Sequence, residues 1–414
     1  MPLPLLRPFP GLRPAPNRVA EVAAPPYDVL NSEEARVRAK GKEWSFLHVS
    51  KPEIDLPSGI DAHSDAVYAK GADNFFRMIE SGILMRDPVP CYYVYRLTMG
   101  GHSQTGLVAA ASVAAYDENR IRKHEFTRPD KEDDRVRHIE TLRAQTGPVM
   151  LAHQPNAKAA SIIRLACALP PDLETVADND VTHVLWVVSR PEWVAALTAA
   201  FADVKALYIA DGHHRSAAAS RVAAAMRQAN PAHRGDEAYN SFMVVTFPKD
   251  EMQILDYNRV VRDLNGLTAA EFIDRLEVNF DIRNVKEPAR PAAPGQFGLY
   301  LEGRWRLLTL RHQPPANVNP VEKLDVSLLY DLVLSPVLGI GDQRTDSRID
   351  FVGGMRGLKG LAARVDSGEM AVAFAMFATS MDDLMAVAEA GEVMPPKSTW
   401  FEPKLADGLV CNML

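Results

Sequence analysis

The stretch that decides the fold is "LYIADGHHRSAAASRVAAAM", residues 207–226. An apolar run typical of a β-strand stops at Asp211-Gly212, and an alanine-rich pattern typical of an α-helix follows. Two histidines and an arginine stand at the junction. We therefore predict a strand, a tight turn at Gly212, and a helix that follows Arg215 and ends near Ala229.

The polar residues of this DGHHR turn have the chemistry of a phosphate site. A helix N-terminus offers unpaired backbone N–H groups and a partial positive charge, both of which favour phosphate. The residues expected to contact phosphate are Gly212, His213, Arg215 and Ser216. Asp211 is expected to bind Mg²⁺ or to orient a substrate, and His214 to transfer protons. Two alternatives stay open: Asp211 only caps the helix, or the histidines bind zinc, although adjacent histidines in one turn seldom both face one ion.

The remaining chain alternates between helical and strand patterns. A β-hairpin is predicted around a Gly100-Gly101 turn, and helices over 135–145, 191–202 and 325–339. The β-runs are too clustered for a simple Rossmann alternation, so the predicted fold class is mixed α/β (α+β). We expect three segments, which are residues 1–90, 91–250 and 251–414.

Composition limits the class of protein. Charged residues make up 24% of the 414, the net charge is −7, and no basic run as long as six residues occurs, so nucleic-acid binding is not expected. No run approaches the length of a membrane span, and the proline-rich N-terminus does not resemble a signal peptide. The three cysteines show no CxxC spacing, which fits a cytoplasmic protein.

Two resemblances follow from these motifs. "IADGHHR" before a helix of small residues resembles the phosphate-binding signature of the ParB/sulfiredoxin-like superfamily, and is most similar to its free serine kinases. The ordered series "APPYDVL", "KHEFT", "DDR", "DGHHR", "YNRVV", "FVGG" and "MPPKSTWFEPK" resembles the family known as domain of unknown function 1015 over nearly the whole chain. The resemblance implies a ParB/sulfiredoxin-like nucleotide-binding core within 91–250, with further α/β elements on both sides.

The "KHEFT" motif supplies a candidate general base. In the serine kinases a glutamate upstream of the DGHHR turn serves as base, and sequence order assigns Glu125 to that role. The local pattern departs from the kinases, since His124 precedes the glutamate. Positive charge toward phosphate would come from Lys123, His124 and Arg128. The alternative is an exposed charged loop in which Asp133 and Asp134 cap the next helix.

Two proline-stiffened motifs could contribute further groups. Lys397 of "MPPKSTWFEPK" is a candidate phosphate contact, although no Walker glycine loop precedes it; alternatively the segment is a rigid surface connection. In "APPYDVL", Tyr27 and Asp28 either line the site or only form a turn.

The resemblance implies a phosphotransferase that uses ATP or ADP with Mg²⁺ on a small hydroxyl-bearing metabolite, with free L-serine as first choice. Glu125, Asp211 and His214 would be its catalytic residues. A non-catalytic nucleotide sensor and a phosphatase acting on a phosphorylated metabolite remain alternatives. The expected partners are the nucleotide and the small molecule, and homo-oligomerisation is left open.

Overall fold

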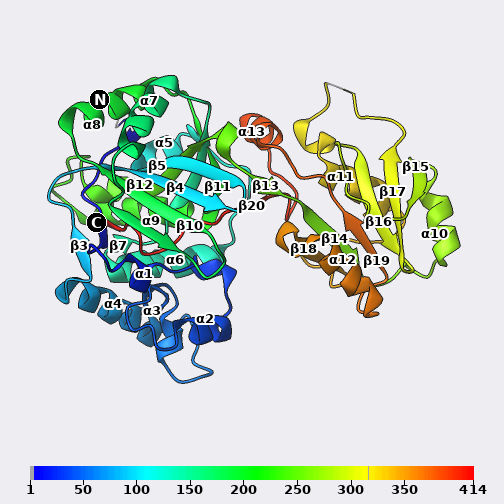
Figure 1. Ribbon diagram of the computed structural model, residues 1–414, viewed down its shortest axis with the longest axis horizontal. Helices are drawn as coiled ribbons and strands as arrows, with labels where there is room; N and C mark the ends of the chain where they lie inside the picture. The colour runs from blue at the N-terminus through cyan, green and yellow to red at the C-terminus, as the bar shows by residue number, and fades with distance from the viewer. Residues whose placement is uncertain (1–3, 316) are drawn as a thin grey trace. The chain divides into compact units, whose positions relative to one another are not determined.

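The chain forms two compact units in the computed structural model, which describes residues 4–315 and 317–414 (Figure 1). The first unit contains the chain up to Met252 together with Pro403–Leu414, and the second contains Gln253–Glu402. The boundary expected near residue 250 lies beside the observed one. The expected boundary at 90 does not separate two units, and the last twelve residues return to the first unit. The division therefore differs from the three consecutive segments that were expected.

The first unit is built on a nine-stranded mixed sheet with strands in the order β6-β11-β8-β12-β5-β4-β10-β9, in which β1 also pairs with β5. Most neighbours are antiparallel, but β11 is parallel to β6, and β12 is parallel to β8. The strands are β1 (Leu6–Arg7), β4 (Tyr92–Met99), β5 (His102–Ser112), β6 (Ile121–Arg122), β8 (Val149–His153), β9 (Leu173–Val176), β10 (Thr182–Val188), β11 (Leu207–Asp211) and β12 (Ser241–Pro248).

Helices cover this sheet and extend the unit on one side. They are α1 (Val19–Val22), α2 (Ser32–Ala39), α3 (Leu47–Ser50), α4 (Asp65–Glu80), α5 (Val113–Asp117), α6 (Pro129–Leu142), α7 (Ala157–Cys167), α8 (Pro191–Ala202) and α9 (His213–Ala229). In Figure 1, α2, α3 and α4 gather at the opposite side of the unit from α7 and α8. Small side chains let α9 pack closely: Ala219 and Ala223 lie in the sheet core, and Ala218 packs with Ile139 of α6.

The N-terminal helices share a core with segments from the rest of the unit, which explains why residues 1–90 are not a separate unit. Phe46 and Phe75 pack edge to face, with ring centroids 6.4 Å apart, in a cluster that also contains Leu142 and Cys411. Two small antiparallel pairs fix the chain ends here, β2 (Leu12–Pro14) with β3 (Leu84–Arg86), and β7 (Ala144–Gln145) with β21 (Asn412–Met413).

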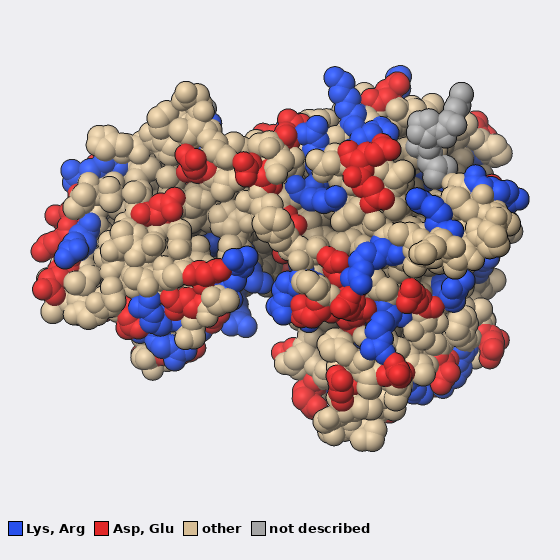
Figure 2. All heavy atoms as spheres, turned by 180° about the vertical axis from the view of Figure 1, so that it is seen from behind, with Lys and Arg blue, Asp and Glu red and all other residues tan. Residues whose placement is uncertain are grey.

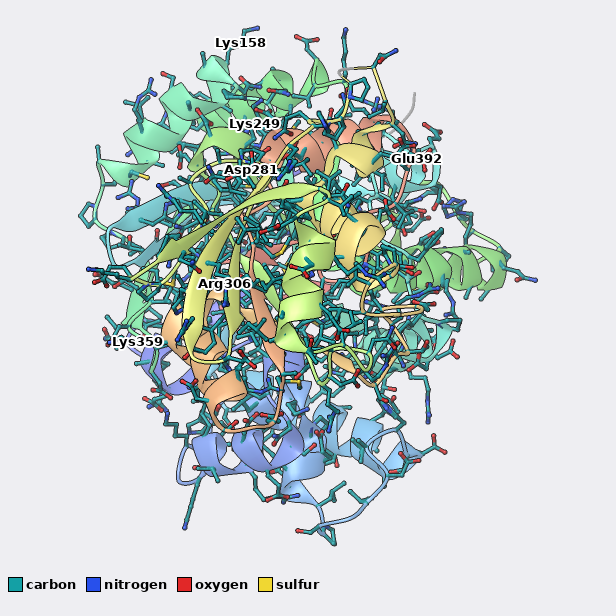
Figure 3. All side chains as sticks on the ribbon, turned by 90° about the vertical axis from the view of Figure 1, so that its right-hand side faces the viewer. Lys158, Lys249, Asp281, Arg306, Lys359 and Glu392 are labelled. Atoms are coloured by element: carbon teal, nitrogen blue, oxygen red, sulfur yellow. The ribbon has the colours of Figure 1, made fainter. Side chains whose placement is uncertain are left out.

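The second unit contains a six-stranded antiparallel sheet in the order β15-β17-β16-β19-β14-β18, and a separate β13–β20 pair. Asp281 of β15 and Arg306 of β17 are labelled on this sheet in Figure 3. The elements are β13 (Ile254–Leu255), β14 (Tyr257–Val261), α10 (Ala269–Leu276), β15 (Phe280–Val285), β16 (Gln296–Leu301), β17 (Arg304–Leu310), α11 (Asp325–Leu329), β18 (Ile349–Gly353), α12 (Gly357–Asp366), β19 (Val372–Ala375), α13 (Met381–Glu389) and β20 (Trp400–Phe401).

The mixed α/β fold class is confirmed, and several expected elements are present. The hairpin is β4–β5 with Gly100 at positive φ, and the helix expected over 191–202 is α8. The helix expected over 135–145 begins earlier, because Pro129 fits the first turn of a helix, and it ends at Leu142. The helix expected over 325–339 is α11 followed by a π-helical turn, Tyr330–Leu334.

Two surface features bear on partners. On the faces shown in Figure 2, basic and acidic side chains are interspersed within each unit. Among residues 4–315 and 317–414, no helix is both long and apolar enough to cross a membrane.

Candidate functional site

Parallel pairing of β6 with β11 brings the "KHEFT" segment to the DGHHR turn. Ile121 pairs with Leu207, and Arg122 with Tyr208. The ends of two parallel strands meet at the same edge of a sheet, so the residues after β6 lie beside those after β11. This register explains how Glu125 reaches the turn, although the two segments are far apart in the sequence.

The turn itself is tighter than expected. Gly212 has φ of +101°, in the left-handed region, and α9 begins directly after it at His213. The prediction that the helix follows Arg215 was therefore wrong, because a glycine at positive φ lets the chain enter the helix within one residue. Both histidines and Arg215 belong to the first turn of α9, so their side chains leave the helix in different directions.

His213 points toward the "KHEFT" segment. Its Nδ1 lies 3.6 Å from Oε2 of Glu125, and its ring meets that of His124 edge to face, with centroids 4.5 Å apart. Both histidines are buried, whereas the Glu125 side chain is 58% exposed. Burial lowers the pKa of His124 to about 4 and that of His213 well below its usual range. Both rings are therefore neutral at pH 7, and the positive charge expected from His124 is absent.

The other expected contacts of this turn are engaged within the protein. Nε2 of His214 accepts a hydrogen bond of 3.1 Å from the backbone N–H of Arg128. Ser216 is fully buried, and its hydroxyl donates to the carbonyl of His213 at 2.9 Å. These contacts fix the start of α9, and the proposed roles of His214 in proton transfer and of Ser216 in phosphate binding stay predictions.

Arg215 points to the opposite side, into a network of charges. Its Nη2 donates to Oδ2 of Asp211 at 2.9 Å, and its Nη1 donates to the carbonyl of Pro148. Nζ of Lys404 lies 3.9 Å from the other carboxylate oxygen of Asp211. Burial opposes ionisation of Asp211, but Lys404 and Arg215 hold its pKa at about 2. A carboxylate with two cationic neighbours is a poor ligand for Mg²⁺, so the structure disfavours the predicted metal role of Asp211.

Arg215 also lines a pocket with an empty volume of about 450 Å³, part of it open to solvent. Tyr27 and Asp407 line it, and the guanidinium of Arg135 lies 3.9 Å above the Tyr27 ring. Burial raises the pKa of Asp407 to about 7, although Arg215 opposes this shift. Tyr27 therefore lines this pocket, and its role in a functional site stays a prediction.

Several other candidates have a different environment from the one expected. Lys397 lies in the second unit with φ of +57°, and its Nζ lies 5.6 Å from the Tyr257 ring centroid; its phosphate role stays a prediction. Asp133 and Asp134 do not cap α6, because the helix already begins at Pro129. Asp133 instead pairs with Arg221 of α9 at 2.7 Å.

Sequence reasoning missed two groups near Arg215, Lys404 and Asp407. Both follow the second unit in the chain, and the pairing of β21 with β7 returns this segment to the first unit. Lys404 ends the "MPPKSTWFEPK" motif, so the motif marks this lysine in the sequence, whereas the predicted phosphate contact was Lys397. Asp407 had no local signal, since "LADGL" is an ordinary turn pattern.

The fold and this turn define a mixed α/β protein in which a strand–DGHHR–helix junction faces a glutamate from the loop that follows the neighbouring strand β6. The chain belongs to the family described as protein of unknown function (DUF1015), whose model matches residues 6–327. A comparison with curated proteins found no match.

Solved structures to which this chain is similar include a free serine kinase in complex with AMP, which is 14% identical, with 71% of this chain and 86% of that chain covered and a TM-score of 0.35. A conserved hypothetical protein from Pyrococcus furiosus is 15% identical, with 72% and 94% covered and a TM-score of 0.34. SbnI with C-terminal truncation from Staphylococcus aureus is 12% identical, with 72% and 84% covered and a TM-score of 0.36.

Proposed function

We propose that this protein is a phosphotransferase that moves a phosphoryl group from ATP or ADP to the hydroxyl of a small metabolite, with free L-serine as the first acceptor to test. The observation that carries the proposal is the position of Glu125, whose Oε2 lies 3.6 Å from Nδ1 of His213, the first residue of α9. The DGHHR motif, with its resemblance to the serine kinases, supports the same reaction class. The nucleotide would supply the phosphoryl group.

Glu125 is the proposed general base. Its side chain is largely exposed, so a substrate hydroxyl can reach it, and it lies where the N-terminus of α9 favours an anion. His213 faces Glu125 and is a positioning residue in this proposal, because its neutral ring cannot offset the negative charge of a phosphate.

The phosphate contacts differ in kind from those first expected. The first-turn N–H groups of α9 have no partner within the helix and would hold the phosphates. Arg215 would act indirectly, since its guanidinium already holds Asp211 and the carbonyl of Pro148. Lys404, whose side chain is 22% exposed beside Asp211, is the proposed cationic phosphate contact. Mg²⁺ would enter with the nucleotide, because this ion is commonly bound through phosphate oxygens and keeps several waters.

The test is incubation with L-serine, Mg²⁺ and either ATP or ADP, with phosphoserine measured by mass spectrometry. Glu125→Gln is expected to lower the rate by roughly 10²-fold or more while nucleotide binding persists. Glu140→Gln, an exposed glutamate on α6, is the matched control and should leave the rate unchanged.

The same experiment separates the alternatives. Nucleotide binding without turnover, unaffected by Glu125→Gln, would identify a sensor. Release of phosphate from phosphoserine without nucleotide would identify a phosphatase. If the protein neither binds nucleotide nor forms phosphoserine, the proposed function is wrong.

A further inference from the structure

Three side chains that can bind a metal converge at the junction of β6 and α9. His124, Glu125 and His213 each offer one ligand atom, and these atoms all lie within 4.8 Å of one another. They come from two segments that only the fold brings together. We propose that the three residues form a binding site for a divalent transition-metal ion, with Zn²⁺ as the probe.

His124 is already in the form that binds a metal. Its Nδ1 is buried and has no hydrogen-bond partner among the described residues. The ring hydrogen-bonds to the backbone of Ile209, so the bond is made by the other nitrogen, Nε2. An imidazole that donates one N–H to a backbone carbonyl presents a lone pair on its other nitrogen, as metal-binding histidines commonly do. An unsatisfied buried nitrogen destabilises a fold, and an ion would satisfy this one.

His213 and Glu125 complete the set of ligands. Nδ1 of His213 and Oε2 of Glu125 are 3.6 Å apart, close to the roughly 3.4 Å between two ligands of one tetrahedral Zn²⁺. Nε2 of His213 faces the N–H of His124 at 3.5 Å, which is long for a hydrogen bond. Binding through Nδ1 requires the tautomer with the proton on Nε2, so this weak contact is lost and the ring must turn slightly to keep the two N–H donors apart.

Burial makes the site asymmetric. The two histidines close one side, and the exposed carboxylate leaves the other open to solvent. Three protein ligands and an open position are the arrangement of catalytic rather than structural zinc sites. Both rings are neutral at pH 7, so an ion would not compete with a proton on imidazolium.

The ligand types indicate which metal binds. Two imidazoles and one carboxylate suit Zn²⁺ and other first-row transition metals, whereas Mg²⁺ prefers oxygen ligands alone. His214 is not a member, since its Nε2 accepts from Arg128 N–H. The two adjacent histidines therefore do not share an ion; the second imidazole comes from the "KHEFT" segment.

This inference rests on geometry and is independent of phosphoryl transfer. If the protein binds Zn²⁺ here but forms no phosphoserine, the metal site is supported and the proposed function is contradicted. If it forms phosphoserine but does not bind Zn²⁺, the proposed function is supported and the metal site is contradicted. A carboxylate bound through one oxygen retains a second oxygen, so metal binding and the proposed base are compatible.

The test is calorimetric titration of the full chain with ZnCl₂ in the absence of nucleotide, with bound metal counted by elemental analysis. We expect one Zn²⁺ per chain. Affinity should fall by at least roughly 10-fold in His124→Gln and in Glu125→Gln, and remain unchanged in the matched control His214→Gln. MgCl₂ should not compete at equal concentration.

Because His124 is buried, its variant could fail to fold, so the exposed Glu125→Gln carries the decisive comparison. Co²⁺ supplies a second measurement: the native protein should give the visible absorption of a four- or five-coordinate ion, altered in Glu125→Gln. Absence of stoichiometric Zn²⁺ binding, or unchanged affinity in Glu125→Gln, would overturn the proposal.

Discussion

The two sides of the first turn of α9 differ in the charge state and burial of their side chains. On the Arg215 side, buried and half-buried charges stand beside opposite charges, with Asp211 between Arg215 and Lys404. On the His213 side, the buried rings are neutral and the carboxylate of Glu125 is exposed. Paired buried charges hold a structure in place, whereas neutral imidazoles with an accessible carboxylate can bind and react. We therefore expect substitutions of Arg215 to act mainly on stability and substitutions of Glu125 mainly on the proposed reaction, with Lys404 as the one proposed phosphate contact on the Arg215 side.

The largest expected effect is on the paired side. Arg215→Met should lower the free energy of unfolding by about 3–5 kcal/mol, because it leaves Asp211 without its closest partner and the Pro148 carbonyl without a donor. Chemical denaturation measures the change. Arg221→Met on the same helix is the control: its exposed pairs with Glu132 and Asp133 should be worth about 1 kcal/mol or less. Equal losses in both variants would contradict the comparison.

The next effect depends on pH. Burial raises the pKa of Asp407 to about 7 from 3.8, so the folded state holds this proton more tightly than the unfolded state. Stability should therefore fall as pH rises from about 4 to about 7. Asp407→Asn should remove this part of the slope and gain on the order of 4 kcal/mol at most at pH 8, with little change at pH 4.

The measurement is denaturation of both proteins across that pH range. The difference between them isolates Asp407, because Asp325 in the second unit, whose pKa burial also raises to about 7, titrates in both. Parallel stability curves would show that Asp407 does not titrate in this range.

A smaller effect is expected at the turn that separates the two sides. Gly212→Ala should destabilise by about 2–3 kcal/mol, because alanine is strained at φ of +101° and its Cβ would lie 3.1 Å from Nε of Arg215. Gly235→Ala shares the strain at φ of +97° but has open space around its Cβ, so about 1–2 kcal/mol is expected there. Thermal or chemical unfolding compares the two, and an equal cost would remove the argument for close packing against Arg215.

The smallest effect concerns Lys404. Lys404→Met should change stability by about 1 kcal/mol or less, since both partners are partly exposed. The pKa of Asp211, held at about 2 against burial by Lys404 and Arg215, should rise. Carboxyl titration followed by NMR would detect this rise, and an unmoved pKa would show that Lys404 is not a significant neighbour.

Strongly patterned segments could be predicted from the sequence, and long-range pairings could not. The hairpin around Gly100-Gly101 and the helix over 191–202 have distinct ends in the sequence, and β4–β5 and α8 lie at these positions. The β6 strand has two residues and no local pattern, yet its pairing with β11 places Glu125 at the turn. The resemblance to the kinases anticipated that placement, whereas periodicity did not.

Burial explains the remaining differences at the site. A sequence of adjacent histidines and arginine suggests concentrated positive charge, but His213 is neutral because it is buried, and Arg215 is occupied by Asp211. Neither burial nor pairing can be read from the local sequence. Two further charged groups of this network, Lys404 and Asp407, lie almost 200 residues away in the sequence and reach the turn only through the fold.

The measurement that tests the central claim most directly is a double-mutant cycle on the rate of nucleotide-dependent phosphoserine formation, with Glu125→Gln and His213→Gln alone and combined. If the two residues act as one unit, each single change should slow transfer by roughly 10²-fold or more, and the double variant should be no slower than the slower single variant. Reductions that multiply in the double variant would show that the two residues act independently and would contradict the account.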